Sequence, residues 1–181
     1  MFRYRVDGDI ELKMLEEEHS RELFSLVDKN RDYLREWLPW LDRNQTEEDS
    51  KTFIRNSFVQ FIEGVGITSG IFFRDKLVGV MGIKIDKMNN SGEIGYWLDA
   101  NYQGKGIVTK ACRKIINYAF GNLGLNRIVI RCATGNRKSR AIPEHLGFTK
   151  ESILREAEFL YDHYEDLIVY SMLKKEWYNK K

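Results

Sequence analysis

Residues 92–109 read GEIGYWLDANYQGKGIVT and join an apolar run to a glycine-containing turn and a helical pattern. The run at 92–99 predicts a strand, and the turn with Gly104 and Gly106 opens a helix over 104–120. The first turn of a helix carries N–H groups without intrahelical partners, and with the helix dipole these attract an anion. Both glycines leave room for a phosphate to approach the backbone. The stretch therefore predicts a phosphate site where the strand meets the helix.

The turn matches neither of two common phosphate motifs. A P-loop ends in Gly-Lys-Ser/Thr, and the sequence has no such triplet at the required spacing. The dinucleotide-binding fingerprint needs a third glycine where this chain has Thr109. Lys105 offers a positive charge and Thr109 a hydroxyl to a bound phosphate. On the glycines alone, a plain turn before a helix is an equal alternative.

Hairpin-like runs precede this stretch. Residues 67–73 and 77–85 are rich in apolar side chains and are separated by a charged turn at 74–76. A polar loop at 86–91 leads into the strand at 92–99. Such short connections predict antiparallel neighbours in one sheet.

The chain after the turn alternates between helix and strand patterns. Apolar residues recur every three or four positions over 104–120, and an apolar run at 127–132 predicts a buried strand. A short helix is expected at 138–146, followed by strands at 148–154 and 164–173.

The N-terminal part predicts a strand and two helices. Apolar and charged residues alternate at 10–14, and helical spacing follows from 16 to 38, where Pro39 marks a break. Thr46 and Asp49 form a sequence close to a capping box, which predicts the start of the second helix.

Composition and element order limit the class of protein. The order predicts one α+β domain over residues 1–181 with a mixed sheet. With 29 basic and 27 acidic side chains, we expect neither a nucleic-acid nor a membrane partner. Cys112 and Cys132 form no CxxC, so neither a disulfide framework nor a metal site is expected. The sequence lacks a signal peptide and any run near the ~20 apolar residues of a membrane span, which predicts a cytoplasmic protein.

Two sequence blocks resemble one enzyme superfamily. Gln103 and Gly106 match the first and fourth positions of motif A, Gln/Arg-x-x-Gly-x-Gly/Ala, of the GCN5-related N-acetyltransferases, whereas Val108 departs from the last position. Residues 136–140 (NRKSR) and 144–148 (EHLGF) resemble the Asn-x-x-Ser…Glu-x-Leu-Gly-Phe signature of the same superfamily. The resemblance covers nearly the whole chain.

Both ends of the chain resemble one branch of this superfamily. The segments 37–40 (WLPW) and 176–177 (EW) look like those of the ribosomal-protein N-terminal acetyltransferases. The resemblance implies the single-domain fold of the superfamily, with a mixed, mostly antiparallel sheet flanked by helices. It also implies that the central strands, 92–99 and 127–133, splay apart.

The resemblance implies acetyl-CoA as the co-substrate and no metal. The pantetheine arm is expected to lie in the gap between the splayed strands, and the pyrophosphate on the amides of the turn. The residues implied to bind it are Trp97, Leu98, Asp99, Gln103, Gly104, Lys105, Gly106, Ile107, Val108, Thr109 and Asn136.

The resemblance also implies catalytic roles. Glu93 would act as the base that takes a proton from the amine, the Leu98 N–H as the oxyanion donor, and Ser139 as the proton donor to the leaving thiolate. The residues alone leave other roles open. Glu93 is equally well a solvated or ion-paired carboxylate, Ser139 a helix-cap residue, and Asn136 a turn residue.

The expected acceptor is an amine, foremost the N-terminal α-amine of a protein such as a ribosomal protein. A small amine, such as a polyamine, an amino acid or an antibiotic, fits the core motifs equally well. A third hypothesis is a module that binds acetyl-CoA without catalysis. The branch resemblance and the aromatic C-terminal stretch also lead us to expect a homodimer.

Overall fold

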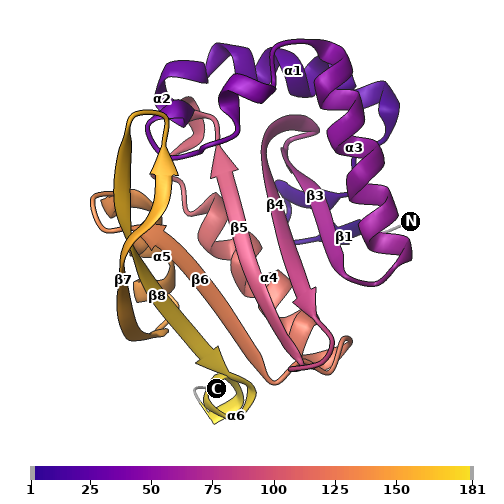
Figure 1. Cartoon of the computed structure of the whole chain (residues 1–181). Coiled ribbons are helices and arrows are strands. Elements are labelled where there is room, and N and C mark those ends of the chain that lie inside the picture. Colours follow the sequence, from indigo (N-terminus) through magenta and orange to yellow (C-terminus); the bar gives the residue numbers. More distant parts are fainter. Residues whose placement is uncertain (1–2, 180–181) are drawn as a thin grey trace.

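The computed structural model describes residues 3–179, which form an eight-stranded sheet with the spatial order β1-β2-β3-β4-β5-β6-β8-β7 (Figure 1). The strands are β1 (Arg3–Arg5), β2 (Ile10–Lys13), β3 (Gly66–Phe73), β4 (Lys76–Asp86), β5 (Ser91–Leu98), β6 (Arg127–Ala133), β7 (Thr149–Leu160) and β8 (His163–Leu173). The helices are α1 (Ser20–Lys29), α2 (Arg31–Arg35), α3 (Glu47–Ile62), α4 (Ile107–Gly121), α5 (Arg137–His145) and α6 (Lys174–Asn179).

Strands β5 and β6 form the one parallel pair among residues 3–179, and their pairing is short. It joins Ser91–Glu93 of β5 to Arg127–Val129 of β6, and the two strands have no paired residues further along. Figure 1 shows the two strands diverging toward the end of β5. All other neighbouring strands in the described part run antiparallel. The α+β class, the mostly antiparallel sheet and the splayed central strands are therefore confirmed.

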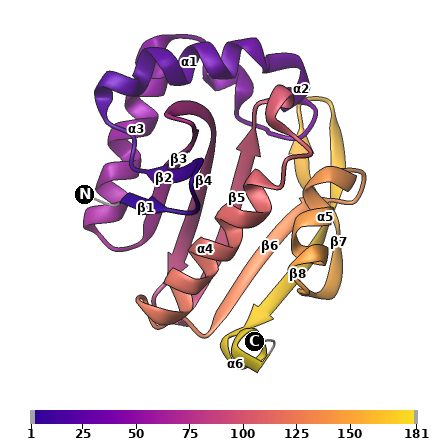
Figure 2. The ribbon, with the colours of Figure 1, turned by 180° about the vertical axis from the view of Figure 1, so that it is seen from behind.

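Helices cover both faces of the sheet. Helix α4 crosses the back face behind β5 and β6, whereas α1 and α3 lie over β3 and β4 at the front (Figures 1 and 2). The face of α4 that the apolar spacing predicts is buried against the sheet, as that spacing requires. Its residues are Val108, Ala111, Cys112, Ile115, Ile116, Ala119 and Phe120.

The helical stretch expected at 16–38 is broken at Asn30, which separates α1 from α2. The Asn30 side chain is buried and explains the break. Its Nδ2 donates to Leu26 O at 2.9 Å, and its Oδ1 accepts from Ala100 N at 3.1 Å. The break therefore ties the N-terminal helices to the turn that follows β5.

The remaining differences concern the ends of elements. Helix α4 begins at Ile107 and not at 104, because Gly106 is its left-handed N-cap. Strand β7 runs to Leu160, beyond the expected 154, and β1 and α6 were not predicted. The capping box of α3 is present as expected, with Asp49 N donating to Thr46 Oγ1 at 3.3 Å. Within residues 3–179, no helix is long and apolar enough to cross a membrane.

Candidate active site

A cavity of about 510 Å³ opens where β5 ends and α4 begins. Helix α2 and the segment after it form one wall, and α5 forms the opposite wall. The residues that line it are Tyr33, Leu34, Trp37, Leu38, Tyr96, Trp97, Leu98, Tyr102, Gln103, Gly104, Gly106, Ile107, Val108, Thr109, Asn136, Lys138, Ser139, Ala141, Ile142 and His145. Nine of the eleven residues expected to bind acetyl-CoA are among them.

The glycine turn forms an anion cradle at the floor of this cavity. Gly104 and Gly106 have φ values of +74° and +69°, in the left-handed region that favours glycine. A Cβ at either position would meet no atom within 4 Å, so the space above the turn is open. The first N–H groups of α4 have no intrahelical acceptor, which leaves them for an anion such as a pyrophosphate.

A chain of polar contacts spans the mouth of the cavity. Lys138 Nζ donates to Gln103 Oε1 at 2.8 Å, and the Gln103 amide donates to the Tyr33 hydroxyl. These contacts join α2, the glycine turn and α5, and they bring a positive charge next to the cradle. Neither Tyr33 nor Lys138 could be identified from the sequence, because Tyr33 belongs to no motif and Lys138 occupies a variable position of the Asn-x-x-Ser signature.

Two residues expected to contact the co-substrate lie outside the cavity lining. Lys105 extends toward aromatic rings, with its Nζ 4.9 Å from the centroid of Tyr102. The buried Asp99 carboxylate accepts from Lys29 Nζ at 2.8 Å and from Asn101 N at 3.0 Å. Burial opposes the ionisation of Asp99, but these hydrogen bonds outweigh it and hold the pKa of the carboxyl below its usual value. The geometry gives Asp99 a positioning role, in which it fixes α1 to the end of β5.

The gap between β5 and β6 exposes backbone groups of β5. Beyond Glu93, this strand has no paired neighbour on its β6 side. Asp99 N donates to Val78 O on β4 at 2.7 Å, and successive N–H groups of a strand point to opposite edges. The Leu98 N–H therefore points into the gap, where the oxyanion donor was expected. The free edge can accept an extended ligand as an added strand.

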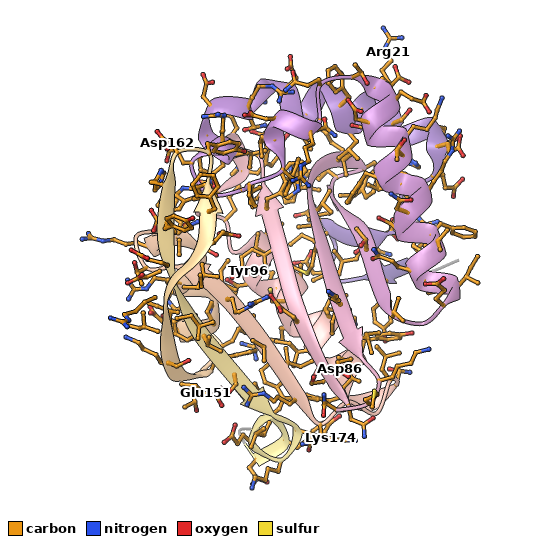
Figure 3. All side chains as sticks on the ribbon, in the orientation of Figure 1. Arg21, Asp86, Tyr96, Glu151, Asp162 and Lys174 are labelled. Atoms are coloured by element: carbon orange, nitrogen blue, oxygen red, sulfur yellow. The ribbon has the colours of Figure 1, made fainter. Side chains whose placement is uncertain are left out.

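Helix α5 places Asn136 and Ser139 at this gap. Asn136 is the N-cap, and its Oδ1 accepts from Ser139 N at 3.0 Å. The cap therefore uses the Ser139 backbone and leaves the Ser139 hydroxyl out of the capping bond. Tyr96 Oη donates to Ser139 O at 3.0 Å and so ties β5 to α5 across the gap. Figure 3 labels Tyr96 between β5 and β6, near the middle of the sheet.

A second cavity of about 260 Å³ meets the first one across the gap. Trp37, Leu38, Tyr96, Asn136 and Ser139 line both cavities. A molecule in the first cavity can thus present a reactive end to a molecule in the second. The polar side chains of the second cavity include two carboxylates.

These two carboxylates, Glu93 and Glu158, have different surroundings. Both oxygens of Glu93 accept from Arg131, at 2.9 Å from Nε and 2.9 Å from Nη2. Glu158, on β7, is half-buried. Burial raises the pKa of the Glu158 carboxyl, and the carboxylates of Glu165 and Glu93 add to the rise, while Arg131 opposes it. A carboxylate with a raised pKa is a better proton acceptor, so Glu158 suits the role of a base.

Glu158 was missed in the sequence because no motif surrounds it. It reaches the cavity only through the pairing of β7 with β8, in which it lies opposite Glu165. Cys132 also lines the second cavity, and burial raises the pKa of its thiol to about 11, against the effect of Ser139. Cys132 is therefore a neutral thiol near pH 7.

Comparisons with known proteins agree with this geometry. Residues 9–149 match the acetyltransferase (GNAT) domain. A Bacillus subtilis (strain 168) protein, provisionally named as a ribosomal N-acetyltransferase, is 38% identical over 184 residues that cover 100% of both chains.

Two solved structures are also similar. RimL, a ribosomal L7/L12 alpha-N-protein acetyltransferase in complex with coenzyme A, has a TM-score of 0.92 at 27% identity, covering 95% of this chain and 98% of that one. The microcin C7 self-immunity acetyltransferase MccE, in complex with acetyl-CoA and AMP, has a TM-score of 0.89 at 34% identity, covering 93% and 94%.

Coenzyme A is thus the ligand of structures that share this fold, and the glycine cradle and the free edge of β5 fit its pyrophosphate and its extended arm. No group of three or more metal-ligating side chains occurs within residues 3–179. Since the domain match covers most of the chain and a relative matches over its full length, the chain belongs to the GNAT family and is an acetyl-CoA-dependent N-acetyltransferase.

Proposed function

We propose that the acceptor is the N-terminal α-amine of a protein, such as a ribosomal protein. The observation that carries the proposal is the second cavity, which meets the co-substrate cavity across the gap and offers a carboxylate with a raised pKa. The relatives named above support the choice of acceptor, since two of them are named for ribosomal proteins.

In this proposal, acetyl-CoA supplies an acetyl thioester, and the residues of the chain position it. The N–H groups at the start of α4 hold the pyrophosphate, Lys138 adds positive charge, and the free edge of β5 pairs with the extended arm. The Leu98 N–H then lies where negative charge develops on the carbonyl oxygen.

The second cavity supplies the proton transfers. The acceptor amine must be neutral to attack the carbonyl carbon, and Glu158 takes its proton, directly or through water. The C–N bond forms as the C–S bond breaks, the Ser139 hydroxyl gives the leaving sulfur a proton, and the proton that the new amide nitrogen loses restores the hydroxyl. Glu93 holds Arg131 in place, since both of its oxygens are committed to the guanidinium.

The test is an acceptor panel followed by mass spectrometry. Peptides with a free α-amine should be acetylated at that amine, while the same peptides with a blocked N-terminus and an internal lysine should stay unmodified. Turnover of small amines without turnover of any peptide would refute the proposal. Binding of acetyl-CoA without turnover of any acceptor would favour the non-catalytic module.

A small-molecule acceptor is the second candidate. The observation that favours it is the likeness to a self-immunity acetyltransferase solved with AMP beside acetyl-CoA. The same panel, extended to polyamines, amino acids and aminoacyl nucleotides, separates the two candidates by kcat/KM.

We propose that residues 1–181 act as a single domain in the cytoplasm, where ribosomal proteins and acetyl-CoA meet. A homodimer is supported by two exposed aromatic side chains on the β7–β8 hairpin, Phe159 and Tyr164, whose ring centroids are 5.0 Å apart. Sedimentation as a monomer at micromolar concentration would refute the dimer.

A further inference from the structure

A third cavity, of about 460 Å³, lies on the front face of the sheet and continues the second one. Glu93, Gly95 and Arg131 line both cavities, so the two join into one groove. The groove runs from the gap between β5 and β6 across β5 and β4 toward α3. Its remaining lining residues are Gln60, Val65, Thr68, Gly82, Ile83, Lys84 and Ile85.

The depth of the groove comes from small residues on neighbouring strands. Thr68 on β3 pairs with Gly82 on β4, and Gly82 pairs with Gly95 on β5. A Cβ at Gly95 would meet no atom within 4 Å, so packing within the chain does not require a glycine there. Glycine inside a strand costs stability and marks places where another backbone approaches closely.

The charges that line the third cavity leave one cation without a counterion. Glu93 and Arg131 neutralise each other in a two-bonded ion pair. Lys84 lies opposite Glu93 in the register of β4 and β5, is exposed, and takes part in none of the ion pairs among residues 3–179. The residues that line the third cavity therefore carry a net charge of +1, from two cations and one carboxylate, and that charge is at Lys84. The second cavity adds the Glu158 carboxylate, on β7 on the far side of Arg131.

We propose that this groove holds the residues that follow the acceptor amine, and that Lys84 selects peptides with an acidic side chain near their N-terminus. The inference rests on the proposed function, because it requires a peptide acceptor. The continuity with the second cavity gives the direction of the peptide, and the uncompensated Lys84 gives the sign of its charge.

Strand geometry fixes which residue of the peptide meets Lys84. Lys84 is two residues along β4 from Gly82, the partner of Gly95, and one strand away from Gly95. With ~3.3 Å per residue and ~4.8 Å between strands, Lys84 lies about 8 Å from the Gly95 end of the groove. An extended peptide covers that distance in two to three residues, so its third or fourth residue reaches Lys84.

The experiment compares kcat/KM for six-residue peptides that carry Glu, Ala or Lys at positions two, three and four. The wild-type enzyme should prefer Glu over Lys at position three or four by about two- to fivefold, the range of an exposed ion pair, and the preference should shrink with added salt. Lys84→Glu should reverse this order. Lys150→Glu, on the far strand β7, makes the same change of charge outside the groove and should keep the wild-type order.

A second variant tests whether the peptide occupies the groove, independently of the charge of Lys84. Thr68→Tyr keeps a residue with high β-propensity and fills the groove, so it should lower kcat/KM for a six-residue peptide more than for an amino-acid amide. Acetylation of peptides with no dependence on charge in wild type and in Lys84→Glu would overturn the inference and leave the proposed function standing. Failure to acetylate any peptide would overturn both.

Discussion

Replacing Gly106 with valine should separate co-substrate binding from folding. Gly106 has a φ of +69°, and a Cβ there would meet no protein atom within 4 Å. The cost to the folded protein therefore comes chiefly from the left-handed backbone conformation, about 1–2 kcal/mol for a residue other than glycine. For a chain of this size, each kcal/mol lowers Tm by about 2–4 °C. The valine should thus leave a folded protein.

Gly106→Val should weaken the affinity for acetyl-CoA more than it lowers the stability of the folded protein. The valine side chain occupies the space above the N–H groups of α4, where the pyrophosphate is expected. Loss of one hydrogen bond to a charged group costs about 1.5–3 kcal/mol, which weakens affinity by roughly 10- to 150-fold. Isothermal titration calorimetry with acetyl-CoA measures this loss directly.

Gly124 provides a matched control for this variant. It has a φ of +68°, and a Cβ there would also meet no atom within 4 Å, but it follows the other end of α4. Gly124→Val should therefore lower Tm by a similar amount and leave the affinity for acetyl-CoA unchanged. Equal affinity of Gly106→Val and wild type, or an equal loss in both variants, would refute the role of the turn.

Three further predictions concern individual carboxylates. Glu158→Gln should lower kcat by about 10²–10⁴-fold, which is more than Glu93→Gln should. Because the pKa of Glu158 is raised, wild-type kcat should fall as the pH drops through the pKa of this carboxyl. Equal losses of kcat in the two variants would argue against Glu158 as the base. Hydrogen bonds from Arg127 and Ser171 lower the pKa of Glu151 to about 2, so its contribution to stability is present above about pH 4.5 and is lost as the pH falls toward 2. Glu151→Gln should therefore flatten the decline of Tm over that pH range. A decline equal to that of wild type would contradict this. Asp99→Ala should lower the free energy of unfolding in urea by about 1–3 kcal/mol, because it leaves Lys29 Nζ and Asn101 N–H without their buried acceptor. A decrease below about 0.5 kcal/mol, the size of an ordinary surface substitution, would refute the positioning role of Asp99.

The anion cradle was predictable because it is local. Gly104, Gly106 and the first turn of α4 are contiguous, and the N–H groups of a helix start point the same way in any fold. The apolar spacing of α4 was predictable for a related reason, since one face of a helix must be buried. Asn136 was expected as a co-substrate ligand or a turn residue, whereas the structure shows that it is the N-cap of α5, which begins at Arg137 and not at 138.

The break at Asn30 shows where local reasoning fails. The helical spacing continues through it, and one of the two hydrogen bonds that hold the Asn30 side chain comes from Ala100 N, 70 residues away. Propensity within a window cannot detect a partner at that distance. The polar contacts at the mouth of the cavity could not be predicted for the same reason. They join Tyr33, Gln103 and Lys138, which come from three segments that are distant in the sequence.

The sequence by itself determined the class of fold, the position of the anion cradle and the family, because each of these depends on residues that are close together along the chain. Only the tertiary structure distinguishes Glu158, the proposed proton acceptor, from Glu93. It pairs Glu93 with Arg131 across the gap, and it half-buries Glu158 beside other carboxylates through the β7–β8 pairing. The pKa of a carboxyl depends on burial and on charges within a few ångströms, and both are set by the packing of segments that are distant in the sequence.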